Sequence, residues 1–133
     1  MRMQPVFAAL MLAVSSSAAA VDLQDIEYLS GADNTRQRAM FYDPKPDKPV
    51  PLVVALHTWS GGYRQQHHKP IREWCMKKGW AYIHPDFRGP ARRPEATGSE
   101  LVIGDIVSAV AHASKTTRID AKAVFLVGTS GGG

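Results

Sequence analysis

The sequence predicts an α/β protein with a mostly parallel, doubly wound sheet, and the pattern of strands and helices supports this prediction. Apolar runs with the length of buried strands occupy residues 52–56, 80–84 and 124–127. Helix-like segments separate these runs, one at residues 71–78 and one that follows Ser99. Alternating units of this kind form parallel sheets with right-handed crossovers.

An antiparallel β-hairpin is predicted at the edge of this sheet, before the first apolar run. Residues 25–30 and 37–42 alternate loosely between apolar and polar side chains, and residues 31–35 are rich in turn formers. Residues 43–51 contain four prolines, which cannot donate to a β-ladder. We therefore expect an extended surface connection there and not a domain linker.

The first helix is indicated by apolar side chains at helical spacing, namely Ile71, Trp74 and Cys75. Pro70 suits an early helical turn, and Gly79 supplies a C-terminal stop. Because Cys75 is the only cysteine in the sequence, no intrachain disulfide can form. We expect a buried structural thiol at this position.

The second helix is predicted to begin after Ser99, which can cap it. Asp105 is expected opposite the apolar face or near the helix start, where its charge suits the helix dipole. The predicted apolar face consists of Val102, Ile103, Ile106, Val107, Val110 and Ala111.

Composition excludes several classes of protein. Hydrophobic content of 44% and charged content of 21% are ordinary for a soluble globular protein. The net charge of +4 comes from scattered residues without an aromatic-basic pattern, so a nucleic-acid partner is not expected. His67, His68 and His84 have no metal-ligand spacing with any pair of carboxylates, so no metal site is expected.

Residues 1–20 have the features of a secretory signal peptide. Arg2 precedes an apolar run at residues 6–14, and alanines at 18 and 20 supply small residues before a cleavage site at Val21. The apolar run is too short for a membrane-spanning helix, although a retained anchor is the alternative. We expect a secreted or periplasmic protein, without stable membrane association, whose mature part here is residues 21–133.

The end of the sequence carries a nucleophile-elbow pattern. An apolar strand at residues 124–127 runs into Gly-Thr-Ser-Gly-Gly at residues 128–132, which reads G-x-S-x-G. In such an elbow a strand turns sharply into a helix, the serine backbone is strained, and its Oγ is exposed. The glycines leave room where side chains would crowd the neighbouring strand and helix. A glycine-rich loop without function is the alternative.

Three landmarks follow one another along the chain: His57 after the first apolar strand, Pro-Asp-Phe-Arg-Gly at residues 85–89, and Ile119-Asp120 leading into the elbow. In this order they resemble the α/β-hydrolase superfamily, and within it the prolyl-oligopeptidase-like and esterase-like branch. The resemblance covers roughly residues 50–133. In this fold the catalytic acid and histidine follow the serine, so both would lie beyond residue 133. The sequence thus resembles a truncated, N-terminal part of a catalytic domain.

The resemblance implies roles for individual residues. Ser130 matches the nucleophile, Gly131 the residue whose N–H is one oxyanion donor, and Trp59 the residue that supplies the second donor. The family has a glycine after the histidine, and Thr58 stands here instead. Tyr63 is a weaker candidate for the substrate pocket.

Other polar side chains near the landmarks have structural interpretations. His57 is expected to brace its loop and not to transfer protons. Asp86 with Arg88 is interpreted as a buried pair that braces the loop, with substrate binding as the alternative.

The implied function is that of a secreted serine hydrolase, which cleaves an ester or amide through an acyl-enzyme with a Ser-His-Asp triad. Esterase is favoured over peptidase, because the mature chain begins shortly before the core strands and leaves no space for a propeller domain. The expected substrate is a small-molecule ester, a glycoside ester or a short peptide, and no cofactor is required. The alternative is a noncatalytic binding protein that keeps the fold, with Trp59 and Tyr63 lining its pocket.

Overall fold

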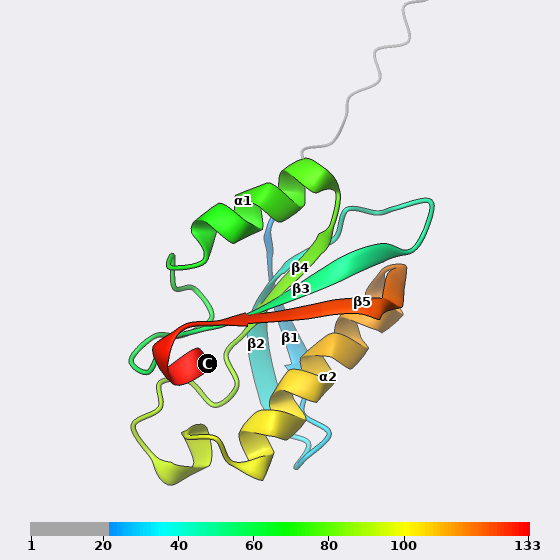
Figure 1. Ribbon diagram of the computed structural model, residues 1–133. Helices are drawn as coiled ribbons and strands as arrows, with labels where there is room; N and C mark the ends of the chain where they lie inside the picture. The colour runs from blue at the N-terminus through cyan, green and yellow to red at the C-terminus, as the bar shows by residue number, and fades with distance from the viewer. Residues whose placement is uncertain (1–21) are drawn as a thin grey trace, which may run out of the picture.

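A five-stranded mixed sheet forms the centre of the computed structural model, which describes residues 22–133 (Figure 1). The predicted signal peptide at residues 1–20 lies outside the described residues. The strand order is β1-β2-β4-β3-β5. The strands are β1 (Gln24–Leu29), β2 (Arg36–Tyr42), β3 (Val50–Leu56), β4 (Ala81–Pro85) and β5 (Ile119–Gly128).

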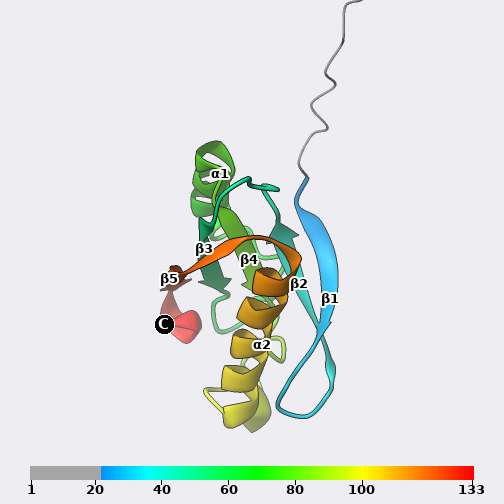
Figure 2. The ribbon, with the colours of Figure 1, turned by 90° about the vertical axis from the view of Figure 1, so that its right-hand side faces the viewer.

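The predicted hairpin is confirmed, because β1 pairs antiparallel with β2 at one edge of the sheet. Figure 2 shows this hairpin on the opposite side of the molecule from the C-terminal end of β5. The proline-rich connection ends earlier than predicted, since β3 begins at Val50 and includes Pro51. The pairing of β3 with β5 is irregular between Val50 and Leu52, so Pro51 lies where the regular ladder is interrupted.

The predicted parallel crossovers are also confirmed. β3 pairs parallel with β4 and with β5, while α1 (Lys69–Lys78) connects β3 to β4 and α2 (Glu100–Thr116) connects β4 to β5. Pro70 lies in the first turn of α1, and Gly79 ends the helix at φ +67°. Ser99 caps α2, because its Oγ accepts a hydrogen bond from the Val102 N–H at 3.3 Å.

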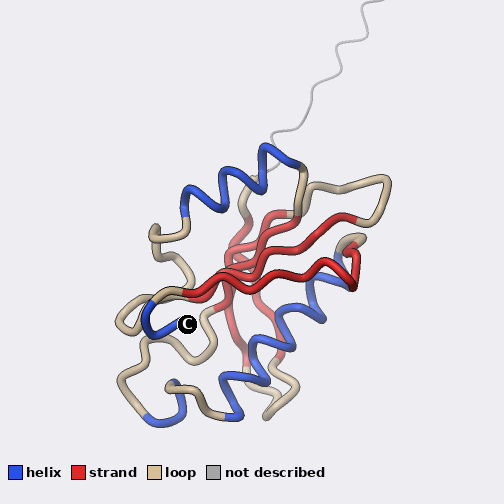
Figure 3. The backbone as a smooth tube through the Cα atoms, in the orientation of Figure 1, coloured by secondary structure: helices blue, strands red, loops and turns tan. Residues whose placement is uncertain are grey.

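The two helices cover opposite faces of the sheet, which gives the chain two hydrophobic cores (Figure 3). The larger core packs α2 through Val102, Ala109 and Ala113 against residues such as Phe41 and Val54. The smaller core lies under α1 and contains Tyr42, Val53, Ala55, Cys75 and Tyr82. Cys75 is a buried free thiol, as the sequence predicted, and burial raises its pKa to about 11.

The apolar face predicted for α2 includes more residues than the helix buries. Ile103 and Val107 are 51% and 62% exposed, because the face that meets the sheet follows the spacing of Val102, Ala109 and Ala113. Asp105 lies on this same face and is completely buried, so the prediction that placed it on the opposite side was wrong.

β5 is the last strand at the other edge of the described sheet and pairs there with β3. Phe125 and Leu126 are 48% and 58% exposed, so this apolar strand is less buried than its sequence predicts. Its apolar side chains point to both faces, as expected of a strand that lies inside a sheet. Neither of the helices between residues 22 and 133 is long and apolar enough to span a membrane.

Candidate active site

The backbone turns sharply where β5 ends, and Ser130 adopts the strained conformation that the elbow pattern predicts. Thr129 is extended, and Ser130 has φ +58° at the start of a short 3-10 turn, Ser130–Gly132. A non-glycine residue in this left-handed region costs about 1 to 3 kcal/mol, and such residues are enriched at functional sites. Figure 1 shows the turn directly after β5, and the Ser130 side chain is exposed.

The glycines around Ser130 are required by close backbone contacts. A Cβ on Gly128 would lie 1.8 Å from the carbonyl oxygen of Gly132. A Cβ on Gly132 would lie 2.6 Å from the carbonyl oxygens of both Leu56 and His57. The turn therefore packs against the end of β3 at distances that only glycine permits.

The structure brings Ser130, Gly131 and Trp59 together. A Cβ on Gly131 would lie 2.7 Å from the Trp59 amide nitrogen, so the two backbones are in direct contact. The hydrogen bonds of the turn join Gly132 N to Thr129 O and Gly133 N to Ser130 O, and the Gly131 N–H takes part in neither. Within residues 22–133 no acceptor binds the Trp59 N–H, so both amides are free for a ligand oxygen.

His57 braces the loop that carries Trp59, as predicted from the sequence. Its Nε2 lies 2.7 Å from the carbonyl oxygen of Asp86, and its Nδ1 lies 2.9 Å from that of Thr58. The ring is 1% exposed and stacks on Phe87 with 3.9 Å between centroids. Because both ring nitrogens face backbone carbonyls, the ring connects this loop to the segment after β4.

The interpretation of Asp86 and Arg88 as a pair was wrong. The Asp86 carboxylate accepts a hydrogen bond from the Tyr63 N–H at 3.1 Å, on the loop that follows Trp59. Phe87 and Arg88 have φ values of +33° and +79°, and this turn sends the Arg88 side chain to other partners. Asp86 therefore still braces the loop, but through the backbone of Tyr63.

Arg88 joins the hairpin to α2 through two carboxylates. Its Nε donates to Asp105 at 2.8 Å, and its Nη1 donates to Asp33 at 2.8 Å. The Arg88 side chain is 9% exposed and that of Asp105 is completely buried. The hydrogen bonds from Arg88 hold the pKa of Asp33 well below its usual range, and the Asp33 carboxylate raises the pKa of Arg88.

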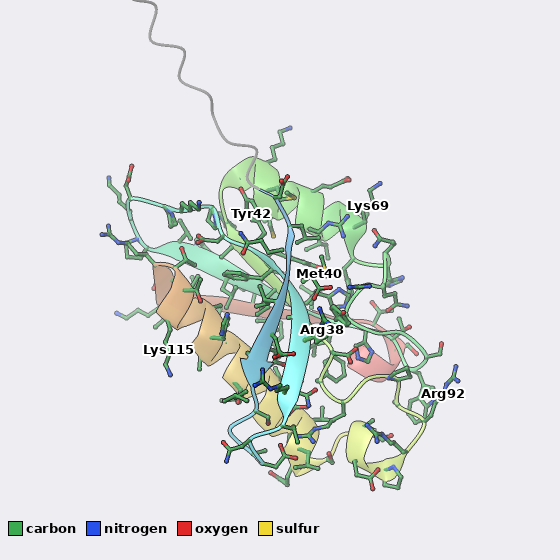
Figure 4. The ribbon with its side chains drawn as sticks, turned by 180° about the vertical axis from the view of Figure 1, so that it is seen from behind. Arg38, Met40, Tyr42, Lys69, Arg92 and Lys115 are labelled. Atoms are coloured by element: carbon green, nitrogen blue, oxygen red, sulfur yellow. The ribbon has the colours of Figure 1, made fainter. Side chains whose placement is uncertain are left out.

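Tyr63 is anchored on the hairpin. Its hydroxyl donates to Asp25 of β1 at 3.3 Å, and the guanidinium carbons of Arg38 and Arg64 lie 5.9 and 5.2 Å from its ring centroid. Figure 4 shows Arg38 and Met40 on β2. Met40 and Tyr63 line a hollow of about 370 Å³. The role of Tyr63 in substrate binding remains a prediction.

Gln65 contacts Thr58, next to the candidate oxyanion donor Trp59, and was not predicted from the sequence. Its side-chain amide forms two hydrogen bonds with Thr58, one to the main-chain nitrogen and one to the hydroxyl. No periodicity or motif marks such a residue, because the contact depends on how the loop folds back over seven residues.

A buried histidine lies beneath this loop. His84 is 2% exposed, and its ring centroid lies 5.8 Å from that of His68 and 6.4 Å from that of His57. Its Nε2 has no hydrogen-bond partner within the described part of the chain. Burial, together with smaller contributions from His68 and His57, lowers the pKa of His84 to about 3. Between residues 22 and 133 no three His, Cys, Asp or Glu side chains gather as a metal site.

We expect His84 to make the protein less stable in acid. The unfolded chain protonates this histidine below its ordinary pKa of 6.5, whereas the folded chain keeps it neutral down to about pH 3. The free energy of unfolding should therefore fall as the pH decreases from 6.5 towards 3, with a loss of about 2 kcal/mol at pH 5. Urea denaturation of the full-length protein and of a His84→Phe variant at pH 5 and pH 8 measures this. A variant with the same pH dependence as the wild type would contradict the assignment to His84.

No family model and no curated protein matches the chain, whereas solved structures do. The esterase Pf2001 of Pyrococcus furiosus has a TM-score of 0.64 and 22% identity, over 84% of this chain and 44% of that chain. The esterase Est22 has a TM-score of 0.58 and 26% identity, over 84% and 35%. The S-formylglutathione hydrolase FrmB from Staphylococcus aureus has a TM-score of 0.59 and 14% identity, over 80% and 46%.

The chain thus spans less than half the length of each of these proteins. In this chain α1 and α2 cover opposite faces of the mixed sheet, and a sharp turn carries Ser130 after β5. On these grounds the chain has the α/β-hydrolase fold of the esterases that it resembles.

Proposed function

We propose that the full-length protein that carries this chain is a serine hydrolase with Ser130 as its nucleophile. The observation that carries the proposal is the position of Ser130, in a left-handed turn beside the unoccupied N–H groups of Trp59 and Gly131. A nucleophile next to two free amide donors is the arrangement that acyl transfer requires.

In the proposed reaction the Ser130 Oγ attacks the carbonyl carbon of a substrate, and the proton of the serine hydroxyl passes to a histidine. This histidine would be supplied by the part of the full-length protein after residue 133. The N–H groups of Gly131 and Trp59 would donate to the oxygen that becomes negatively charged. One such donor lowers the barrier by about 2.7 to 4 kcal/mol. The leaving group departs with a proton, and water then releases the acyl group from Ser130.

We propose an ester of a small molecule as the substrate class. The structural neighbours with TM-scores near 0.6 include several esterases, and one similar structure is a complex with a substrate analogue. A glycoside ester fits the same chemistry. Peptide hydrolysis is the less favoured form of this proposal.

Covalent labelling tests the proposal. The full-length protein should react with a fluorophosphonate probe, and peptide mass spectrometry should find the adduct on the peptide that contains Ser130. It should also hydrolyse p-nitrophenyl acetate faster than a p-nitroanilide of the same acyl group. An adduct on another serine, or no adduct on an enzyme that hydrolyses the ester, would contradict Ser130 as the nucleophile.

We further propose that residues 1–20 are a signal peptide and that the protein is secreted or periplasmic. The support is the sequence pattern of a positive residue, an apolar run and small residues before Val21. Mass spectrometry of the exported protein should find an N-terminus at or near Val21. Intact Met1 in a cytosolic fraction would overturn this proposal.

A further inference from the structure

The side chain of Gln65 bonds across the loop between β3 and α1, in addition to the contacts that His57 and Asp86 make there. The Thr58 N–H donates to Gln65 Oε1 at 2.9 Å, and Gln65 Nε2 donates to Thr58 Oγ1 at 2.7 Å. The Gln65 N–H donates to the Gly62 carbonyl at 2.8 Å, so its own backbone is fixed as well. Both polar atoms of the Gln65 side-chain amide therefore form hydrogen bonds with Thr58.

The space for this amide is provided by Gly61. A Cβ on Gly61 would lie 2.4 Å from Gln65 Oε1 and 2.6 Å from its Cδ. The Gln65 side chain thus lies across the loop, in contact with the backbone at Gly61 and with Thr58. The Gln65 side chain points into the loop and is partly buried. The Gln66 side chain is exposed, and its Nε2 donates to the Arg64 carbonyl.

The Thr58 carbonyl and the Trp59 N–H belong to the same peptide group. The Gly61 N–H donates to this carbonyl at 3.0 Å, and the Nδ1 of His57 lies 2.9 Å from the same carbonyl oxygen. The peptide bonds of residues 22–133 are all trans, so the Trp59 N–H points away from these two partners. The conformation of Thr58 therefore contributes to the direction of the Trp59 N–H, together with the bonds that Gly61 and His57 make to the Thr58 carbonyl.

From this geometry we propose that Gln65 is a positioning residue, which holds Thr58 so that the Trp59 N–H faces the oxyanion beside Ser130. The inference rests on the proposed hydrolase function, and Gln65 itself does not touch the substrate. A threonine between His57 and Trp59 has less backbone freedom than glycine, and its two bonds to Gln65 select one orientation of the peptide.

A positioning role predicts a specific kinetic effect. In the full-length protein, Gln65→Ala should lower kcat for p-nitrophenyl acetate about tenfold, because a tilted donor stabilises the transition state less. KM should stay within about twofold, because the N–H acts on charge that develops only in the transition state. Gln66→Ala is the matched control and should leave both constants unchanged.

Two more variants separate positioning from loss of folding. Gln65→Glu keeps oxygen acceptors for the Thr58 N–H and for its hydroxyl, so it should retain most of kcat. Thr58→Val removes the hydroxyl alone, and its effect should be non-additive with that of Gln65→Ala in a double-mutant cycle. If Gln65→Ala does not fold, Thr58→Val alone should still lower kcat with little change in KM, and a wild-type kcat in that variant would overturn the inference.

The outcomes distinguish this inference from the proposed function. If Ser130→Ala abolishes turnover while Gln65→Ala keeps the wild-type kcat, the inference is wrong and the proposed function stands. A higher KM with an unchanged kcat would likewise overturn it, as would additive effects in the cycle. If the wild type neither reacts with a fluorophosphonate nor hydrolyses the ester, the proposed function fails and the inference falls with it.

Discussion

Replacing Ser130 with alanine in the full-length protein is expected to lower kcat/KM for p-nitrophenyl acetate by a factor on the order of 10⁴ to 10⁶. The variant keeps the two free N–H groups at Trp59 and Gly131, so some catalysis above the rate in water should remain. Because the Ser130 side chain is exposed and its backbone is already left-handed, alanine should change the melting temperature little. Steady-state kinetics and thermal denaturation of the same preparations measure both effects.

Thr129→Ala is the control for this experiment. Thr129 is the exposed neighbour of Ser130, and its side chain makes no capping hydrogen bond. Its variant should keep kcat/KM within about threefold, since surface substitutions away from such contacts have small effects. A Ser130→Ala protein with the activity of the wild type would exclude Ser130 as the nucleophile.

Replacing Asp105 with alanine is expected to reduce the free energy of unfolding by about 3 to 5 kcal/mol, which is the usual effect of removing one partner from a buried ion pair. The change would leave the Arg88 guanidinium, which is 9% exposed, with Asp33 as its remaining carboxylate partner. It would also remove the hydrogen bonds between α2 and Arg88, which lies in the turn after β4. Urea denaturation of the full-length protein at neutral pH gives the measurement.

Asp33→Ala is the matched control, because it removes a second carboxylate from the same arginine. Asp33 is 31% exposed, and Arg88 would keep its two bonds to Asp105. The loss of stability should therefore be clearly smaller than for Asp105→Ala. Equal effects of the two substitutions would show that burial of Asp105 does not determine its contribution.

The strands and the elbow could be predicted from the sequence because their signals are local. Residues 52–56 and 124–127 are continuous apolar runs, and both lie in paired strands of the structure. The strained φ of Ser130 follows from a turn that leaves no room for side chains at Gly128 and Gly132. Here local residue type and tertiary contact agree.

The orientation of α2 could not be predicted from hydrophobicity. Ile103 and Val107 are as apolar as the side chains that meet the sheet, and their spacing is also helical, although both are exposed. Asp105 pairs with Arg88, seventeen residues earlier, and this pair buries a charged side chain on the face of α2 that packs against the sheet. The sequence gives no local signal for this pairing. The same lack of a local signal applies to Gln65, whose contact with Thr58 exists only in the folded loop.

The most direct test of the site is a crystal structure of the full-length protein after reaction with diethyl p-nitrophenyl phosphate. We expect phosphorus bonded to the Ser130 Oγ, with the phosphoryl oxygen about 2.7 to 3.1 Å from the amide nitrogens of both Trp59 and Gly131. Phosphorus on a different residue, or a phosphoryl oxygen that contacts neither nitrogen, would contradict it.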